Sequence, residues 1–250
     1  MPERYIGMGY WEIVSRQMSI VTKSQQTKFK DAKVAVIGCG GIGGSLIEQL
    51  ARMGIGSINL IDNDVFDFSN LNRQSICGLD TLGKEKSYSA KERVRNINPY
   101  VRVKPFNQEL NEDNVEEIIE DSDIVIDAVD NLVTRVIVSR TANKLGIPYV
   151  HGAIHGTMGQ VSVFTPETKT YEEMFQLPSI DKELDEDVKK DINELSHGVT
   201  PAIGPNPNIV GCLEAFEAFK LITGIGEVVY SPKLLTFDLL DLTSFNIIEL

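Results

Sequence analysis

A glycine-rich turn between a short apolar run and a helical pattern places the tightest limit on what this chain can fold into. Residues 33–38 (KVAVIG) are apolar and β-branched, which is typical of a buried strand. Residues 38–43 (GCGGIG) follow with the spacing G-x-G-x-x-G, and residues 45–53 have helical spacing. Residues 57–62 (SINLID) repeat the strand pattern and end in an acid. The order strand, glycine turn, helix, strand predicts a βαβ unit.

The alternation of strand and helix patterns continues beyond this unit. We expect helices over 81–98, over 111–119 with Asn111 as the cap, and over 132–145 with Gly146 closing the last. Strands are expected over 101–106, 123–127 and 147–151. This alternation predicts an α/β fold with a Rossmann-like, mostly parallel sheet and helices on both faces. Residues 158–164, 233–238 and 244–249 predict antiparallel strands that extend the sheet toward the C-terminus.

No composition break divides the chain, so a single domain over residues 1–250 is expected. Its parts are an N-terminal helix over about 9–28, a nucleotide-binding half over about 32–150, a crossover loop over about 165–207, and a C-terminal helix and strands over 208–250. The crossover loop has no sustained periodicity and is rich in acids between 181 and 194. Two interpretations stay open for it, a solvated surface loop or a mobile lid over a substrate channel.

Charge and cysteine content exclude several classes of protein. The 250 residues include 24 basic and 36 acidic side chains, a net charge of −12, which argues against a nucleic-acid binder with a general basic surface. The three cysteines contain no C-x-x-C pair, so no disulfide framework and no zinc-ligand spacing is expected. No apolar stretch is long enough for a membrane span, and the polar start predicts no signal peptide. We therefore expect a cytoplasmic protein.

The glycine turn by itself predicts a nucleotide site. Gly38, Gly40, Gly41 and Gly43 allow a tight turn and a close approach of backbone N–H groups to phosphate, at the positive end of a helix. Asp62, at the end of the next strand, can accept hydrogen bonds from a ribose. At this point the pattern favours a dinucleotide-dependent oxidoreductase over an ATP-dependent enzyme, because such a turn most often binds NAD or FAD.

Further side chains that suit a triphosphate favour the second class. They follow the predicted strands and are Asp64, Asn70, Arg73, Gln74, Lys86, Asp127, Asp130 and Asn131. Arginine supplies forked donors for phosphate oxygens, lysine supplies a point charge, and an aspartate at a strand end can hold Mg²⁺. A nicotinamide dehydrogenase needs no such set, so phosphorus chemistry with ATP and Mg²⁺ is predicted.

The ordered combination of these motifs resembles the ThiF/MoeB/HesA family. It consists of the glycine turn with Gly40-Gly41, the D-x-D of Asp62 and Asp64, N-x-x-R-Q at Asn70, Lys86, and D-x-x-D-N at Asp127. These proteins are bacterial and archaeal relatives of the ubiquitin-activating enzymes, and the resemblance spans about residues 10–250. It implies an ATP-dependent adenylyltransferase that activates the C-terminal Gly-Gly carboxylate of a ubiquitin-like sulfur carrier as an acyl-adenylate. Pyrophosphate is released, and a sulfur donor later forms the thiocarboxylate.

The resemblance also implies roles by position. Asp62 would hold the ribose, Asp130 the Mg²⁺ ion, and Gln74, Asp64 and Asn131 would line or support the site. The phosphates would be held by Asn70, Arg73 and Lys86.

Two further arginines match the family's motifs. Arg16 resembles an arginine that reaches the triphosphate of the neighbouring subunit, which implies a homodimer; a solvated surface charge is the alternative. Arg135 matches the arginine of D-N-x-x-x-R, where contact with the carrier tail or the site wall and a salt bridge within its helix both stay open.

The sequence departs from many relatives in its cysteines and histidines. Cysteine pairs for a structural zinc are missing, and three scattered histidines (His151, His155 and His197) do not replace them, so no zinc is predicted. His151 and His155 are interpreted as structural, because an ionised carboxylate nucleophile needs no general base.

Residues 165–208 contain no cysteine, which predicts that a separate protein donates the sulfur. Cys39 and Cys212 are expected in the core, and Cys77 as the one exposed thiol, without a role.

Two alternatives to the carrier adenylyltransferase remain. One is an ATP-dependent cyclase of the tRNA threonylcarbamoyladenosine dehydratase type, which the lack of a basic surface disfavours. The other is a non-catalytic nucleotide-binding subunit, which the intact set of Arg73, Lys86 and Asp130 disfavours.

Overall fold

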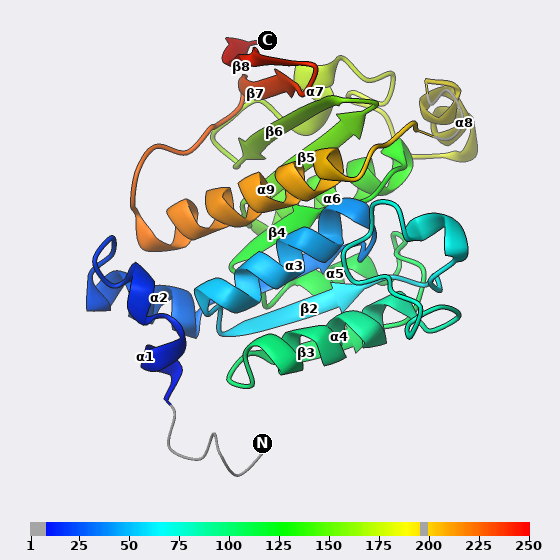
Figure 1. Cartoon of the computed structure of the whole chain (residues 1–250). Coiled ribbons are helices and arrows are strands. Elements are labelled where there is room, and N and C mark those ends of the chain that lie inside the picture. The colour runs from blue at the N-terminus through cyan, green and yellow to red at the C-terminus, as the bar shows by residue number, and fades with distance from the viewer. Residues whose placement is uncertain (1–8, 196–199) are drawn as a thin grey trace.

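A computed structural model describes residues 9–195 and 200–250 of the chain. Its strands are β1 (Lys33–Ile37), β2 (Ser57–Ile61), β3 (Arg102–Phe106), β4 (Ile124–Asp127), β5 (Tyr149–His155), β6 (Met158–Phe164), β7 (Lys233–Asp238) and β8 (Asp241–Glu249). They form one sheet in the order β3-β2-β1-β4-β5-β6-β7-β8 (Figure 1). The first five strands run parallel, and β6, β7 and β8 are antiparallel to their neighbours. The predicted fold class is therefore confirmed.

Helices connect and cover these strands. They are α1 (Tyr10–Ile13), η2 (Ser15–Gln17), α2 (Lys23–Asp31), α3 (Gly41–Met53), η3 (Phe68–Asn70), α4 (Lys86–Ile97), α5 (Val115–Ile119), α6 (Leu132–Leu145), α7 (Tyr171–Phe175), α8 (Glu186–Glu194) and α9 (Pro205–Thr223). Across the two described ranges, no helix has both the length and the apolar character needed to cross a membrane.

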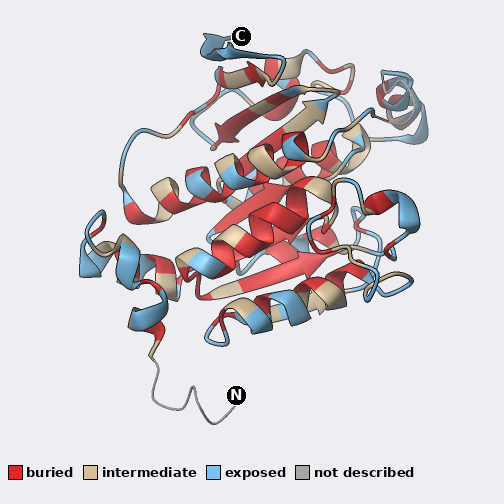
Figure 2. Ribbon diagram, viewed as in Figure 1, coloured by how far each residue is buried: buried red, intermediate tan, exposed pale blue. Residues whose placement is uncertain are grey.

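The central strands β1, β2 and β4 are buried between two helical layers, whereas β8 at the edge of the sheet is mostly exposed. Val34 and Val36 of β1 belong to the core formed with α3, α4 and α9, whereas Ala35 and Ile37 point into the core formed with α5 and α6. Successive side chains of a strand point to opposite faces, so a strand covered on both sides must be apolar throughout. Figure 2 shows the central strands and much of α3 as buried. This double burial explains the near-continuous apolar runs in the sequence.

The carboxyl ends of β1 and β4 meet at the point where the strand order reverses. β1 pairs with β2 on one side and with β4 on the other, and all three run in the same direction. The connections after β1 and β4 therefore leave the sheet on opposite faces, which opens a crevice beyond the strand ends. In Figure 1 this edge lies on the right, where α3 begins.

Several predicted boundaries differ from those in the structure. The first long helix begins at Gly41 rather than Ser45, so Gly41, Gly43 and Gly44 lie within α3. The helix predicted from residue 81 begins only at Lys86, and α5 begins at Val115 after the N-cap Asn114. Asn111 instead accepts hydrogen bonds from the N–H groups of Asp113 and Asn114 in the preceding turn.

Two strands are longer than predicted. The strand predicted over 147–151 continues to His155 as β5, and the strand predicted from residue 244 starts at Asp241 as β8.

The single N-terminal helix expected over 9–28 is wrong. α1 ends at Ile13, η2 follows, and α2 begins only after Thr22. The Thr22 side chain accepts from the N–H of Gln25, whose own side chain accepts from the N–H of Thr22. This reciprocal capping starts a new helix, and sequence periodicity does not reveal the break before it.

The crossover region also contains helices that the sequence interpretation missed. Thr170 caps α7 by the same reciprocal pattern with Glu173, and Asp185 caps α8. In α8 only Val188 and Ile192 are buried, so its apolar face is one residue wide and easily overlooked among acids. His197 lies outside the described residues.

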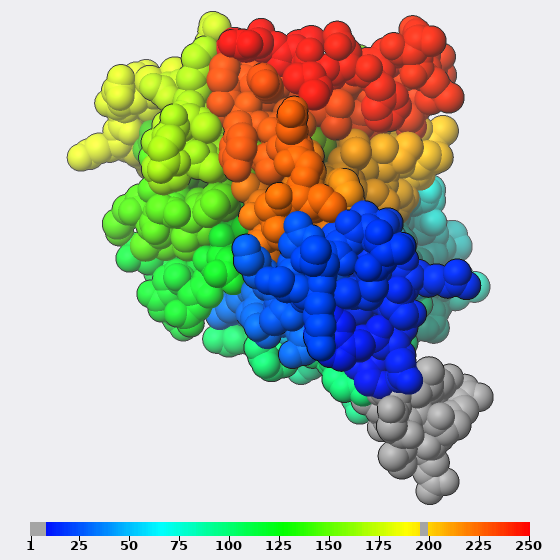
Figure 3. All heavy atoms as spheres, turned by 90° about the vertical axis from the view of Figure 1, so that its left-hand side faces the viewer, coloured from blue at the N-terminus to red at the C-terminus, as the bar shows by residue number. Residues whose placement is uncertain are grey.

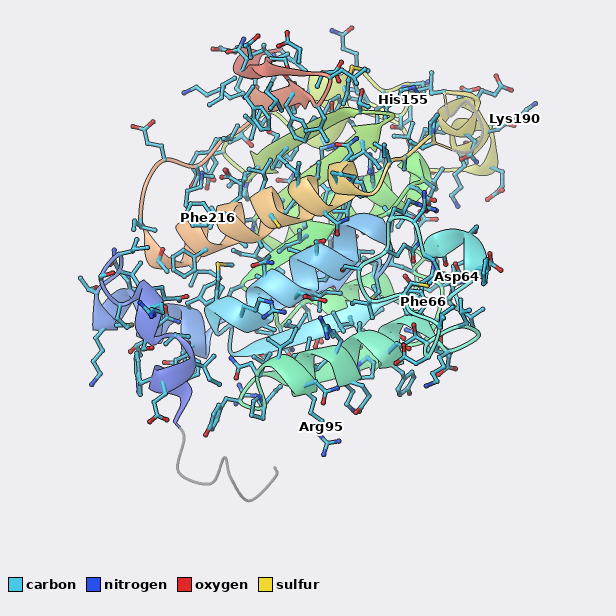
Figure 4. All side chains as sticks on the ribbon, viewed as in Figure 1. Asp64, Phe66, Arg95, His155, Lys190 and Phe216 are labelled. Atoms are coloured by element: carbon cyan, nitrogen blue, oxygen red, sulfur yellow. The ribbon has the colours of Figure 1, made fainter. Side chains whose placement is uncertain are left out.

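The apolar pattern of residues 208–223 predicts a helix that is buried nearly all round, with a narrow polar stripe of Glu214, Glu217 and Lys220. In α9 two members of this stripe lie inside instead. Glu214 and Glu217 are buried, whereas Cys212 is exposed and Phe216 is half exposed (Figure 4). Cys212 is therefore not a core residue, and Cys77, expected to be the exposed thiol, is half-buried. Cys39 is buried, as predicted.

The buried Glu214 predicts a pH-dependent stability. Both of its carboxyl oxygens lack a hydrogen-bond partner among the described residues, and burial, together with the charge of Asp127, raises its pKa well above 4.5. A carboxyl with a raised pKa keeps its proton in the folded state, so the free energy of unfolding falls as pH rises above the unfolded value. We expect Glu214→Gln to remove this fall, gaining at least about 1 kcal/mol relative to wild type between pH 5 and pH 8.

Urea unfolding of both proteins at the two pH values measures this difference. Glu217→Gln serves as the control, because Glu217 is ion-paired with Lys220 at 2.5 Å and its loss should cost stability at both pH values. An equal gain of Glu214→Gln at pH 5 and pH 8 would contradict the assignment.

Candidate active site

The glycine turn forms the floor of the crevice between β1 and β4. Gly38 has φ +98°, and a Cβ there would lie 2.7 Å from the carbonyl oxygen of Ala128. A Cβ on Gly43 would collide with the carbonyl oxygen of Gly38. Only glycine allows α3 to start this close to the ends of both strands. The free N–H groups of the first turn of α3 then lie beside the crevice and favour a negative charge.

A cavity of about 380 Å³ lies above this turn. The residues predicted for the site that line it are Gly38, Gly40, Gly41, Asp62, Asp64, Arg73, Gln74, Lys86, Asp130 and Asn131. Three connections that are distant in sequence, those that follow β1, β2 and β4, thus meet at one edge of the sheet.

Four residues named from the sequence do not line the cavity: Gly43, Asn70, Arg16 and Asp127. Gly43 lies inside the first turn of α3, where it permits the close packing described above. The Asn70 side chain accepts from the N–H of Asp67 and caps the short helix η3. Its position supports the loop that presents Arg73, whereas the predicted phosphate contact stays a prediction.

Arg16 lies far from the cavity of its own chain. Tyr10 donates to the carbonyl of Gly54, and Gln17 donates to the carbonyl of Met53, so the N-terminal segment packs at the end of α3. The cavity lies at the other end of this 13-residue helix, roughly 20 Å away at 1.5 Å per residue. Figure 3 shows the N-terminal segment, in blue, spread over the side of the molecule beside α9.

Asp62 joins the glycine turn to the end of β2. One carboxylate oxygen accepts from the N–H of Cys39 at 2.8 Å, and the other accepts from the N–H of Asp64 at 2.9 Å. Burial raises the pKa of Asp62, and these two hydrogen bonds oppose the rise. The carboxylate is thus fixed at the cavity wall, with remaining lone pairs available for hydroxyl donors of a ligand.

Two cations give the cavity a positive side. The Lys86 ammonium is buried and lies 2.6 Å from the carboxylate of Asp64, which is mostly exposed (Figure 4). Burial opposes the ionisation of Asp64, but the hydrogen bond and charge of Lys86 outweigh it and lower the pKa of that carboxyl. The Arg73 guanidinium donates to the carbonyl of Ser69 and to the side chain of Asn72. Both cations are therefore held in place before any ligand arrives.

The residues opposite the cations fit a metal ion only as part of a larger complex. Asp130 is exposed at the cavity, and Asn131 caps α6 by accepting from the N–H of Thr134. The amide oxygen of Gln74 is buried without a partner in the part of the chain that the structure describes. Within those same residues no group of three or more His, Cys, Asp or Glu side chains could hold a metal ion. A single carboxylate suits Mg²⁺ that keeps its waters and bridges phosphates.

A buried polar cluster beside the cavity was not predicted as such. Asp127, at the end of β4, is fully buried; its carboxylate lies 3.3 Å from Nε of Arg135 and 2.8 Å from Nδ1 of His151, and accepts from the Tyr149 hydroxyl. Burial opposes its ionisation, but the charge of Arg135 and the contact with His151 lower the pKa of Asp127. The sequence showed Asp127 only as part of a motif. Pairing of β4 with β5 places it directly beside His151.

The two histidines of β5 have different surroundings. His151 is fully buried, and burial lowers its pKa although Asp127 opposes this shift, which agrees with a structural role. His155 is exposed at the end of the strand, so its interpretation as structural stays a prediction (Figure 4). Arg135 makes a buried ion pair with β4 and lines the cavity, rather than a surface salt bridge within its helix.

A second groove of about 440 Å³ adjoins the cavity. It lies over β5, β6 and β7, and Ala153 and Ile154 line both spaces. The cavity and the groove therefore meet at these two residues of β5.

Comparison with known proteins identifies the family. Residues 14–250 match the model of the ThiF family. The chain belongs to the ThiF family. The resemblance seen in the sequence is therefore confirmed.

Relatives in this family have similar lengths or are longer. The chain is 35% identical over 227 residues to "SAMP-activating enzyme E1" of Haloferax volcanii, covering 90% of this chain and 80% of that protein. It is 34% identical over 234 residues to "Sulfur carrier protein adenylyltransferase" of Thermus thermophilus, covering 90% and 82%. It spans 54% of the length of "Probable adenylyltransferase/sulfurtransferase MoeZ" of Mycobacterium tuberculosis.

Solved structures support the fold. E. coli MccB with ATP superimposes with a TM-score of 0.79 at 24% identity, over the whole of this chain and 73% of that one.

The positive side of the cavity predicts anion binding by Lys86. We expect Lys86→Met to weaken the binding of inorganic tripolyphosphate at least about tenfold, because a charge-assisted hydrogen bond is lost. Isothermal titration calorimetry measures the change. Lys84→Met is the matched control, since Lys84 is exposed and outside the cavity lining. Equal weakening in both variants would show that only net charge matters.

Proposed function

We propose that this adenylyltransferase uses ATP to activate the C-terminal Gly-Gly carboxylate of a small ubiquitin-like sulfur carrier, of the molybdopterin-synthase small-subunit or ThiS type. The product is the acyl-adenylate, and pyrophosphate leaves. The observation that carries the proposal is one cavity with the glycine turn, Arg73, Lys86 and Asp130, which opens into a second groove at Ala153. Names of relatives such as "Molybdopterin-synthase adenylyltransferase" of Haemophilus influenzae, 35% identical over 204 residues, support this reaction.

The nucleotide would bind across the ends of β1, β2 and β4. The N–H groups at the start of α3 would face phosphate oxygens, and Asp62 would accept from the ribose hydroxyls. Lys86 would exchange its contact with Asp64 for one with phosphate, and Arg73 would add forked donors. Asp130 would hold Mg²⁺, which when bound neutralises phosphate charge.

The chemistry is a substitution at the α-phosphorus. A carboxylate oxygen of the carrier forms a bond to this phosphorus, and the bond to the bridging oxygen of pyrophosphate breaks. The nucleophile is already ionised, so no side chain has to remove a proton. Lys86 and Arg73 would stabilise the negative charge that increases on the phosphate oxygens and the leaving group. Positioning of the two substrates then supplies much of the acceleration.

The second groove would receive the extended carrier terminus. Ala153 and Ile154 lie between this groove and the nucleotide cavity, so a chain end that follows β5 arrives at the phosphate side. Two glycines, which have no side chains, would allow the backbone of the carrier to approach closely at this junction. Sulfur would come from a separate donor, because residues 165–208 contain no cysteine.

A homodimer would complete the site with Arg16. This residue is exposed and lies at the far end of α3, so it can reach a triphosphate only in another subunit. A cytoplasmic location and an active site shared between subunits are part of the same proposal.

Pyrophosphate exchange tests the reaction. Purified protein with Mg²⁺ and ATP should exchange labelled pyrophosphate into ATP only when a Gly-Gly-ending carrier from the same source is present. Arg73→Ala and Asp130→Ala should each lower the rate at least about a hundredfold, the loss typical of a residue that stabilises transition-state charge. Tight ATP binding without exchange for any carrier would refute the proposal.

Mixing two inactive variants tests the shared site. Arg16→Ala and Asp130→Ala should each be inactive alone, whereas a re-equilibrated equimolar mixture should recover roughly a quarter of the wild-type exchange rate, because each mixed dimer contains one intact site. Arg52→Ala mixed with Asp130→Ala is the control, since Arg52 is an exposed arginine near the same end of α3. Arg52→Ala alone should exchange pyrophosphate at the wild-type rate. No recovery with Arg16→Ala would place Arg16 outside the site.

A further inference from the structure

We infer that Arg135 is a positioning residue that holds the turn carrying Asp130 and the strand carrying Ala153 at a fixed separation. The inference rests on the proposed function, because these two elements would carry the metal-bound nucleotide and the carrier terminus. Arg135 would thus set the distance between the two reacting groups without taking part in the chemistry.

Two hydrogen bonds from one nitrogen join the two elements. Nη2 of Arg135 donates to the carbonyl oxygen of Val129 at 2.6 Å and to that of Gly152 at 3.1 Å. Val129 directly precedes Asp130, and Gly152 directly precedes Ala153. β4 and β5 are paired only up to Asp127 and His151, so beyond this register these bonds continue the connection.

The guanidinium of Arg135 also contacts the buried carboxylate of Asp127. Its Nε lies 3.3 Å from the carboxylate of Asp127, and the side chains of both residues are at least nine-tenths buried. This contact is an ion pair without a hydrogen bond, because Nε of Arg135 and Oδ1 of Asp127 both lack a hydrogen-bond partner among the described residues. The hydrogen bonds of the planar group go from Nη2 to the two carbonyls, an arrangement that a lysine ammonium does not reproduce.

Strand β5 is also packed against α9 on the face opposite to Arg135. A Cβ on Gly152 would collide with the carboxyl group of Glu214 from α9. Gly152 is thus packed between Arg135 on one side and Glu214 on the other. Ala153 and Ile154, which follow, form the junction between the nucleotide cavity and the second groove. Small shifts at this point would change the approach of a nucleophile, to which reaction rates are sensitive.

The test compares Arg135→Lys with wild type in three measurements. Hydrogen exchange of the amides at Ala128, which donates to the carbonyl of Ile37, and at 153–154 should accelerate at least about tenfold when measured without carrier. The kcat of carrier-dependent pyrophosphate exchange should fall at least about tenfold. The Kd for ATP should change less than about threefold, because Asp62, Arg73 and Lys86 keep their contacts.

A neutral double variant guards against misfolding. Asp127→Asn with Arg135→Met leaves no unpaired buried charge, so it should fold and show the same three results if Arg135→Lys does not fold. The matched control is Arg140→Met with Glu172→Gln. Arg140 lies on the same helix, pairs with Glu172 at 2.7 Å and donates to the carbonyl of Ser179, but it does not line the nucleotide cavity. This control should leave hydrogen exchange at both walls and kcat within about twofold of wild type.

The outcomes separate the two proposals. Faster hydrogen exchange with unchanged kcat, or a lower kcat with unchanged hydrogen exchange, would overturn the positioning role. Equal effects in the Arg140 control would overturn it as well. If wild type shows no carrier-dependent pyrophosphate exchange, the proposed function fails. Hydrogen exchange, which is measured without carrier, still decides whether Arg135 holds the turn after β4 and strand β5 together.

Discussion

The contact between the glycine turn and the end of β4 is the constraint on which the rest of the structure depends. Gly38 passes so close to Ala128 that a Cβ would lie 2.7 Å from its carbonyl oxygen, and Gly43 packs on Gly38 itself. These contacts let α3 start directly beside the ends of β1 and β4. The turn after β4, which carries Asp130, therefore lies across the crevice from the helix N-terminus. Larger side chains would separate the two halves of the cavity.

Electrostatics then distinguish the cavity from the rest of an acidic chain. The net charge is −12, yet Lys86 and Arg73 meet at the same edge of the sheet. A buried ammonium needs a partner, and Asp64 supplies it at 2.6 Å until a ligand replaces it. Behind the opposite wall, Asp127 and Arg135 pair two buried charges of opposite sign, and Nη2 of Arg135 connects the ends of β4 and β5 by hydrogen bonds. The pair of Lys86 and Asp64 holds a cation ready for a ligand, and the pair of Asp127 and Arg135 keeps the cavity wall in place.

The elements that the sequence predicted well have strong local signals. Helix α6 has the predicted bounds because Asn131 caps its start and Gly146, with φ +72°, closes its end. The wrong predictions concern signals that depend on other parts of the chain. Cys212 was assigned to the core as part of an apolar helix, but α9 exposes it and turns Glu214 and Glu217 inward instead. In α8 two apolar residues, Val188 and Ile192, are enough because the helix packs on one side only.

The sequence by itself determined the βαβ unit, the parallel α/β class and the family, because the spacing of glycines and the apolar runs are local properties. It also named most residues of the cavity, since the ends of parallel strands meet at one edge. Only the tertiary structure decided that Asn70 supports a loop outside the cavity lining and that Arg16 lies at the far end of α3. It alone brought Asp127, Arg135 and His151 together, because such contacts arise from strand register and helix packing rather than from spacing along the chain.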